Sequence, residues 1–219
     1  MIAVLTADLI DSTKYSNSFL EIVLSNLKNE FSRIEENFSE QTTSFDIFRG
    51  DSIQAIIKKP SKALWVALVL KSTLNAIVND TEKNAKTDLK LAIGIGNYQL
   101  EREEIRESNG EAFHFSGRTL DEMKNTGRKL MLATPNSEVN EEFNISLAMF
   151  DYIAERWSVA SAEVVYYLLH GYKEIEISKK LNISQSAVNQ RKKTAGWEVI
   201  DLLLTRFEKK ISATFIEKL

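Results

Sequence analysis

The sequence predicts an α+β protein, and two observations lead to this fold class. Up to about residue 135, short apolar runs typical of buried strands alternate with longer stretches whose apolar residues recur at helical spacing. From about residue 136 onward only helical patterns remain. We therefore expect a domain of mixed strands and helices over residues 1–138 and an all-α domain over residues 139–219, divided near the segment TPNSE.

Strand and helix signals follow one another in a regular order through the first domain. Short apolar runs bounded by polar residues predict strands, and apolar residues at helical spacing predict amphipathic helices. The expected strands cover 2–7, 44–49, 52–58, 88–100 and 128–134, and the expected helices cover 18–38, a stretch opened by Pro60, and 112–125. Gly94 and Gly96 indicate close approach by a neighbouring backbone or helix. The order β-α-β-β-α-β-α-β predicts a ferredoxin-like (βαββαβ) core with an extension.

Composition excludes several classes of protein and of site. The chain has no cysteine, which excludes disulfides, thiolate metal sites and thiol catalysis. No apolar run approaches the roughly 20 residues that a membrane-spanning helix needs. The start, MIAVLTADLIDS, shows neither a basic leader nor a cleavage-site pattern. We therefore expect a cytoplasmic protein without a membrane partner.

Residues 171–193, GYKEIEISKKLNISQSAVNQRKK, carry the most specific signal in the chain. This segment holds six Lys or Arg and two Glu, a charge of +4, which leaves −7 for the remainder because the whole chain carries −3. A basic segment on an acidic chain indicates local contact with a polyanion.

A helix-turn-helix pattern runs through this basic segment. A short helix at 173–181, with its apolar residues on one face, is followed by a turn at Asn182-Ile183. Ser184 is a good N-cap for the next helix, from which Val188 packs inward. The pattern resembles the LuxR-type and sigma-factor region-four motif, in which the second helix enters the major groove of DNA.

This resemblance implies separate roles for the polar and the basic side chains. The candidate base readers follow the cap Ser184 and are Gln185, Ser186, Asn189 and Gln190. The side-chain amides of the Gln and Asn residues can pair with adenine edges. The candidate phosphate contacts are Lys179, Lys180, Arg191, Lys192 and Lys193. Two alternatives stay open: a helical hairpin whose charges only face water, and a fold used for protein contacts.

The final helical run carries an apolar stripe that permits two interpretations. Its members are Val199, Ile200, Leu203, Leu204, Phe207, Ile211, Phe215 and Leu219. The stripe either packs on residues 145–170 or forms a dimer seam. A homodimer would suit a helix-turn-helix protein, because two half-sites raise both affinity and specificity for DNA.

Two aspartates in the first domain are expected to meet at one edge of the sheet. Asp8 ends the first strand, and Asp51 lies in the hairpin turn FRGDSIQ. Two neighbouring carboxylates repel each other unless a cation neutralises them. Carboxylates together with nucleotide phosphates are the ligands that Mg²⁺ prefers. We therefore expect a site for Mg²⁺ or Mn²⁺ with a nucleotide, although either aspartate alone is more typical of a loop cap or a turn.

The segment that follows the first strand is a candidate phosphate-binding backbone. Its residues stand at a strand-to-helix junction, where backbone amides can point at an anion. They are Leu9, Ile10, Asp11, Ser12 and Thr13.

These motifs resemble those of the class III nucleotidyl cyclases, whose catalytic domain is a ferredoxin-like palm, over roughly residues 1–135. ADLIDST resembles the family's first metal motif, with Asp8 as its ligand, and FRGDSIQ resembles the second, with Asp51. In GEAFHFSGRTL, Arg118 matches the arginine that steadies the triphosphate. In that family the metal-binding aspartates and the helix that bears the arginine come from different subunits. The resemblance therefore implies that Arg118 would act across a dimer.

The sequence also departs from the cyclase pattern at two positions, 47 and 114. Ile47 stands where the family has a base-selecting lysine, and Glu107 corresponds to the second base-selecting acid. His114 takes the place of the family's asparagine, where it either donates to a phosphate or packs within its aromatic run. An apolar side chain cannot pair with a purine edge, so we do not expect an active adenylyl cyclase.

The opening AVLTADLIDS, the turn RGDSIQ and the stretch NGEAFHFSGR also resemble the SatD-type proteins. These are bacterial proteins with a cyclase-like N-terminal part and a C-terminal helix-turn-helix. The sequence thus leaves two functions. One is a transcription regulator whose degenerate cyclase-like domain binds a nucleotide and a metal or mediates dimerisation. The other is a metal-dependent nucleotidyl cyclase or nucleotidyltransferase-like enzyme that a helix-turn-helix targets to DNA.

Overall fold

A five-stranded sheet lies at the centre of the computed structural model, which describes residues 1–37, 43–48, 51–78, 86–100 and 109–216. The strand order is β2-β3-β1-β4-β7, with β4 and β7 parallel and the other neighbours antiparallel. The strands are β1 (Ile2–Leu9), β2 (Thr43–Phe48), β3 (Ser52–Ile57), β4 (Leu89–Gly96) and β7 (Leu130–Ala133). Two short strands, β5 (Tyr98–Leu100) and β6 (Asn109–Gly110), form a second sheet.

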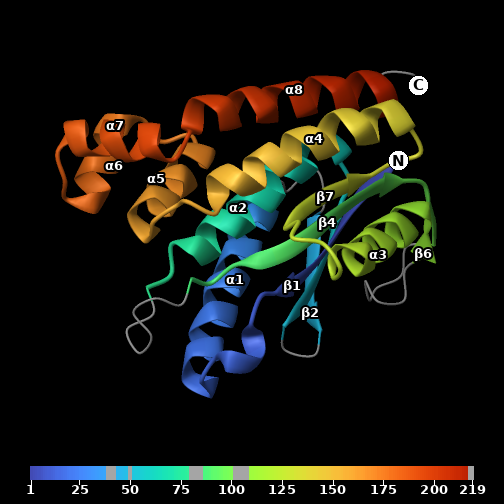
Figure 1. Ribbon diagram of the computed structural model, residues 1–219, viewed down its shortest axis with the longest axis horizontal. Coiled ribbons are helices and arrows are strands. Elements are labelled where there is room, and N and C mark those ends of the chain that lie inside the picture. The colour runs from blue at the N-terminus through green and yellow to red at the C-terminus, as the bar shows by residue number, and fades with distance from the viewer. Residues whose placement is uncertain (38–42, 49–50, 79–85, 101–108, 217–219) are drawn as a thin grey trace.

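Eight α-helices surround the central sheet in the described residues, and the mixed architecture confirms the predicted α+β class (Figure 1). They are α1 (Asn17–Asn37), α2 (Ala63–Asn75), α3 (Glu111–Met123), α4 (Ser137–Ala154), α5 (Val159–Leu169), α6 (Glu174–Leu181), α7 (Gln185–Thr194) and α8 (Trp197–Phe215). Figure 1 shows α4 and α8 side by side along one edge of the molecule and α5, α6 and α7 gathered at one end. Two 3₁₀ turns, η1 (Ser12–Lys14) and η2 (Pro60–Lys62), precede α1 and α2.

The two faces of the sheet are covered by different helices. Successive side chains of a strand point to opposite faces. In β1, Leu5 and Ala7 join the main hydrophobic core, which also contains buried residues of α1 and α2. On the other face, Val4 packs with Ala112 of α3, and the Thr6 hydroxyl donates to Ser116 Oγ at 2.9 Å. Asp8 follows the same alternation and is therefore directed to the α3 side of the sheet.

Gly94 lets α3 approach the sheet closely, as the sequence predicted for this strand. A Cβ atom at position 94 would lie 2.2 Å from the Ala112 carbonyl oxygen and 2.5 Å from the Ser116 amide nitrogen. At Gly96, a Cβ atom would lie 2.9 Å from the Glu111 side chain and 3.0 Å from the Ala112 amide nitrogen. The two glycines therefore set the distance between α3 and β4.

The C-terminal helices share the main core with the sheet. Phe143 and Phe150 of α4 and Phe207 of α8 are buried in the cluster that holds the interior residues of β1, α1 and α2. The Phe143 and Phe207 rings meet edge to face, with centroids 5.0 Å apart. Buried residues from both sides of position 138 thus form one core, and the division into two domains stays a prediction.

The apolar stripe of α8 packs internally. Ile200, Phe207 and Ile211 are buried in the main core, whereas Val199 is 57% exposed. The buried part of the stripe is therefore unavailable as a dimer seam. Residue 219 lies outside the described residues.

The structure corrects two of the expected strand ends. β1 continues through Asp8 to Leu9, because β3 and β4 pair with it on both sides up to Asp8. The strand expected at 88–100 is divided, since Asn97 separates β4 from β5. Within the described residues, no helix combines the length and the apolar character that crossing a membrane requires.

We expect Gly94→Ala to lower the free energy of unfolding by about 3 kcal/mol, because the added methyl group meets backbone atoms that cannot rotate away. Gly117→Ala is the matched control, since a Cβ atom there meets nothing within 4 Å and position 117 lies inside α3. The control should stabilise the protein by up to about 1 kcal/mol through helix propensity. Urea unfolding of both variants measures the difference, and equal stability of the two would contradict the close approach.

Candidate functional site

Asp8 and Asp51 lie together at one edge of the central sheet. In the β1–β3 ladder, Asp8 stands opposite Ser52, the residue after Asp51. The Leu9 amide donates to the Asp51 carbonyl oxygen at 3.0 Å, which fixes the hairpin turn against the end of β1. The structure thus brings together the two aspartates that the sequence predicted as neighbours, although they are 43 positions apart.

Two serine hydroxyls hold the aspartates in a crossed arrangement. Ser52 Oγ donates to Asp8 Oδ1 at 2.7 Å, and Ser12 Oγ donates to Asp51 Oδ2 at 3.0 Å. The second oxygen of each carboxylate makes no hydrogen bond with any other described residue. Two oriented carboxylates, each with an oxygen to spare, fit a hard divalent cation such as Mg²⁺ or Mn²⁺. Within the described residues, no cluster of three or more acidic or histidine ligands is present.

Two lysines that the sequence analysis did not single out flank Asp8. Lys90 stands opposite Asp8 in the β1–β4 ladder and donates from Nζ to the Met123 carbonyl oxygen at 3.3 Å, at the C-terminal end of α3. The hydrogen bond to Asp121 raises the pKa of Lys124, and the charges of Asp121 and of Asp8 add to this effect. The aspartate pair therefore lies in a partly cationic surrounding.

The predicted phosphate-binding backbone is only partly available. The Leu9 amide donates to Asp51, and the Ile10 amide donates to the Asp88 carbonyl oxygen at 2.9 Å. These two amides cannot hold a phosphate without losing those bonds. Asp11, with φ 58°, begins the η1 turn, and its carboxylate pairs with Lys14 at 3.0 Å. Ser12 contributes its hydroxyl to Asp51, so the donors left in this segment are the amides of residues 11–13 and the Thr13 hydroxyl.

The other residues of the cyclase resemblance do not meet the aspartate pair within one chain. His114 and Arg118 are exposed on α3, and no hydrogen bond or ion pair joins either of them to another described residue. His114 is therefore not buried within its aromatic run, and a role toward phosphate stays a prediction. Ile47 packs against the main core. Glu107 lies outside the described residues.

A buried ion pair supports the segment beneath the aspartates. The Lys71 ammonium and the Asp88 carboxylate are 3% and 6% exposed and lie 2.6 Å apart. Asp88 also accepts from Asn75 Nδ2 at 3.1 Å and from the Leu89 amide at 2.9 Å, and Lys129 lies 3.2 Å from its other oxygen. Burial alone would raise the pKa of Asp88, but Lys71 and then Lys129 hold it below its ordinary value. The Asp88 carbonyl oxygen in turn holds the Ile10 amide.

A second candidate site is the unit formed by α6 and α7, called here the α6–α7 unit (residues 174–194). Asn182, in a left-handed conformation with φ 51°, ends α6. Ser184 caps α7, with its side chain accepting from the Ala187 amide at 3.1 Å. Val188 and Ile177 are fully buried against Val164 of α5. These contacts fix the position of α7 on α5 and α6.

The predicted base readers differ in exposure. Gln185, Ser186 and Gln190 are exposed on α7, whereas Asn189 is half-buried. The hydrogen bond of Lys192 lowers the pKa of Glu174, and Asn189 contributes to this shift with a weaker hydrogen bond. Three of the four predicted readers therefore face outward, and Asn189 is engaged with α6.

The predicted phosphate contacts also divide into two groups. Lys179, Lys180 and Lys193 are exposed, with the Lys180 ammonium 4.6 Å from the centre of the Tyr172 ring. By contrast, Lys192 donates to Glu174 at 2.9 Å, and Arg191 lies 3.8 Å from Glu163 of α5. Two of the five basic side chains thus have acidic partners within the chain.

We expect Asp88→Asn to cost about 3–5 kcal/mol of stability, because it leaves the Lys71 charge buried without its counter-charge. The folded pKa of Asp88 lies below its unfolded value of about 3.9. The stabilisation that ionised Asp88 gives to the folded state is therefore present above pH 4. It is lost as the pH falls through the folded pKa of Asp88.

Urea unfolding between pH 7 and pH 3 checks both statements. The part of the loss in unfolding free energy on acidification that Asp88 causes should be absent in Asp88→Asn. Asp121→Asn is the control, since that carboxylate is 72% exposed in its pair with Lys124. Wild-type stability in Asp88→Asn would contradict the role given to the pair.

Comparison with known proteins gives one similar solved structure and a family. The chain is similar to the solved structure of the guanylyl cyclase Cya2, with 14% sequence identity and a TM-score of 0.44, over 60% of this chain and 74% of that one. No curated protein matches the sequence. The sequence model of the SatD family matches residues 1–210, which is nearly the whole chain. The chain therefore belongs to the SatD family.

Proposed function

We propose that this SatD-family chain is a DNA-binding transcription regulator whose α6–α7 unit is a helix-turn-helix. The observation that carries the proposal is the way α7 is held. Its N-terminus is capped by Ser184 and its inner face is fixed by the buried Val188, while Gln185, Ser186 and Gln190 stay exposed. A helix held in this way can enter the major groove with its first turns against base edges.

The distribution of charge supports the same proposal. The exposed Lys179, Lys180 and Lys193 lie on α6 and α7, where they can reach phosphates on both sides of a groove. Arg191 and Lys192 would join them only after leaving Glu163 and Glu174. Their release would be favoured by the dense negative charge of DNA, which offers each side chain a phosphate in place of its carboxylate.

In this proposal the N-terminal part is a degenerate cyclase-like domain. Its support is the antiparallel order β2-β3-β1-β4, which is the order expected of a ferredoxin-like sheet. This part binds a nucleotide together with Mg²⁺ or Mn²⁺, or brings two copies of the chain together. A homodimer would present two α7 helices to two half-sites on DNA.

Selection from a random DNA library, followed by binding measurements across salt concentrations, tests DNA binding. We expect Gln190→Ala to cost about 1–3 kcal/mol on the selected sequence and little on random DNA, because an amide reads base edges. Lys193→Ala should weaken both and reduce the slope of log K against log salt by about 1, because it removes one phosphate contact.

Lys28→Ala is the matched control for the loss of a single positive charge, since Lys28 is exposed on α1. Selection that enriches no sequence, together with binding that Lys193→Ala and Lys28→Ala weaken equally, would argue against a helix-turn-helix function.

A metal-dependent nucleotidyl cyclase or nucleotidyltransferase is the second candidate, and the crossed Asp8–Asp51 arrangement favours it. Asp8 and Asp51 would hold the cation, and Ser52 and Ser12 would keep the carboxylates oriented. Bound Mg²⁺ would supply charge neutralisation at phosphate oxygens. Lys90 and Lys124, beside Asp8, would attract the phosphates.

Calorimetry with each ribonucleoside triphosphate in the presence of Mn²⁺ separates the two roles of this part. We expect binding of a metal–nucleotide complex that falls at least tenfold in Asp8→Asn and in Asp51→Asn, since each loses a charged ligand worth about 1.5–3 kcal/mol. Glu138→Gln, at an exposed position on α4, is the control for loss of one negative charge. Product detected by mass spectrometry and lost in both variants would establish the enzyme, whereas unchanged binding in both variants would remove the aspartates from the site.

A further inference from the structure

The outer side of α4 and α8 carries a cluster of exposed apolar side chains, called here the α4–α8 face. Of the eleven large apolar side chains that are exposed in the described residues, five lie on these two helices. They are Ile145, Met149, Tyr152, Val199 and Leu202. The spacing of positions 145, 149 and 152 places these three on one side of α4. Single exposed apolar residues are common on protein surfaces, but a cluster of this kind marks an interaction surface.

α4 and α8 run antiparallel, which brings the apolar side chains of the two helices to the same level. Arg206 Nε donates to the Glu142 carboxylate at 2.7 Å, near the start of α4. Met149 lies about two turns after Glu142, and Val199 lies about two turns before Arg206. The two side chains therefore stand beside each other on neighbouring helices, which Figure 1 shows side by side along one edge of the molecule. The five apolar residues thus form one continuous face.

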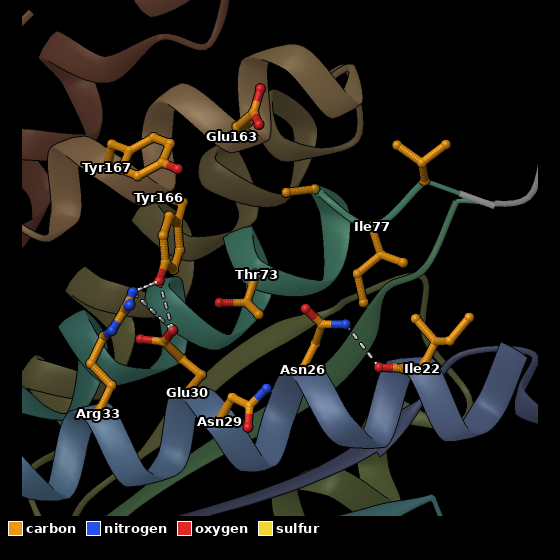
Figure 2. Close-up of a pocket in the computed structure, with 12 residues that line it drawn as sticks. Ile22, Asn26, Asn29, Glu30, Arg33, Thr73, Ile77, Glu163, Tyr166 and Tyr167 are labelled. Carbon is orange, nitrogen blue, oxygen red and sulfur yellow. Dashed lines mark hydrogen bonds and ion pairs between the residues drawn. The ribbon is translucent and has the colours of Figure 1, made fainter. Parts of the chain in front are cut away.

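The helices that present this face are fixed to the rest of the molecule. α5, which follows α4 in the chain, is tied to α1 across a cavity of about 520 Å³ between α1, α2 and α5 (Figure 2). There the Tyr166 hydroxyl donates to Glu30 Oε2 at 2.8 Å and accepts from Arg33. Phe143 and Phe207 anchor α4 and α8 themselves in the main core. A partner therefore meets a surface that is already ordered, which lowers the entropic cost of binding.

At one end of the face, the two helices carry charges of opposite sign. Glu138 and Glu141 are exposed at the start of α4, and Lys209 is exposed in the second half of α8. Because the helices are antiparallel, these residues share the end at which Glu142 pairs with Arg206 within the chain. Glu141 and Lys209 make no hydrogen bond or ion pair with another described residue. This end therefore offers an acid on α4 and a base on α8 that are both available to a partner.

At the other end of the face, the signs on the two helices are reversed. Glu198 and Asp201 are exposed in the first turns of α8. Neither makes a hydrogen bond or ion pair within the part of the chain that the structure describes. Arg156 stands just beyond α4, and its guanidinium lies 3.4 Å from the centre of the Tyr152 ring. The face thus has an apolar middle between two ends whose charges are opposite on α4 and α8.

We propose that the α4–α8 face binds a second copy of this chain, with α4 of each copy lying on α8 of the other in a four-helix bundle. A two-fold axis along the helices keeps every residue at its own level, so the apolar middle of one copy meets that of the other. Glu141 then meets the partner's Lys209, and Arg156 meets the partner's Glu198. Each helix is antiparallel to both of its neighbours, as in common four-helix bundles.

This arrangement also determines where the two α6–α7 units lie. α7 directly precedes α8, so the unit lies at the end of the face where α8 begins (Figure 1). A two-fold axis along the helices brings both units to the same end of the bundle, where they can meet two half-sites on one DNA. This consequence rests on the proposed DNA-binding function, whereas dimerisation itself does not.

Analytical ultracentrifugation of the full chain without DNA is the first test. We expect a dimer whose dissociation constant rises by about tenfold or more in Leu202→Asp, because a charge enters the apolar middle of the interface. Ile22→Asp on α1 is the matched control, since Ile22 is 50% exposed, compared with 69% for Leu202, and lies outside the face. Urea unfolding checks that both variants fold. A chain that stays monomeric up to millimolar concentration, which would leave the face to a different protein, or equal weakening by both variants would overturn the proposal.

Exchange of charges tests the contact between Glu141 and the partner's Lys209. Glu141→Lys and Lys209→Glu should each weaken the dimer several-fold, because each places like charges opposite one another. The double variant should restore the dimer, since it re-forms the pair with the signs reversed. A dimer that neither single change weakens would contradict this contact.

Disulfide formation tests the arrangement of the helices, since the chain has no cysteine of its own. Oxidation of a mixture of Glu141→Cys and Lys209→Cys chains should give a covalent dimer, whereas either variant alone should not. A covalent dimer formed instead from Glu198→Cys and Lys209→Cys chains would place α8 on α8 and overturn the arrangement. Because these measurements contain no DNA, failure of DNA binding leaves their outcome unaffected.

Discussion

The buried ion pair between Lys71 and Asp88 is the interaction on which the rest of the structure depends. It joins α2 to the residue that precedes β4, and Lys129 extends it to the start of β7. The backbone of Asp88 also fixes Ile10, directly below the aspartate pair. A buried ion pair is costly to desolvate and adds little net stability over apolar packing. Removing one partner, however, strongly destabilises the protein, because the other charge stays buried without a counter-charge. Its effect is therefore to allow one arrangement of these elements, which gives the sheet edge a fixed geometry.

α5 is the element that connects the two candidate functions. On one side it enters the main core, where Val165 is buried, and Trp65 of α2 donates from its indole nitrogen to the Leu169 carbonyl oxygen at 2.9 Å. On the other side, Val164 is buried against Val188 and Ile177. A shift of α5 would move the α6–α7 unit relative to the sheet. Communication between the two sites would require that a ligand bind two positions of α5 with different affinity.

The features that the sequence could predict are those encoded locally. The hairpin that carries Asp51, the cap at Ser184 and the need for glycine at position 94 each follow from a few neighbouring residues and a known spacing. The crossed bonds of Ser12 and Ser52, and the position of Lys90 opposite Asp8, depend on strand register between segments far apart in the chain. Periodicity assigns a residue to a face but not to a partner, so these contacts were missed.

The same limit applies to Glu30 and His170. From sequence alone, the position of His170 is explained by a favourable interaction with the C-terminal end of its helix. In the structure, its side chain also lies beside Glu30 of α1. A carboxylate on an amphipathic helix is expected to face water, and only the approach of α5 buries this one. Tertiary contact between the two halves of the chain therefore creates a polar cavity that neither half encodes.

The charge around the aspartate pair limits what it can bind. Two carboxylates attract a divalent cation, and Lys90 and Lys124 also lie near Asp8, with Lys124 paired to Asp121 at 2.7 Å. A phosphate arriving alone would be repelled by the carboxylates, which a bound cation would neutralise. A metal–nucleotide complex brings both charges at once, so each part meets its complement. In the proposed cyclase-like role, the sheet edge would therefore suit a phosphate that arrives together with its metal ion better than a phosphate alone.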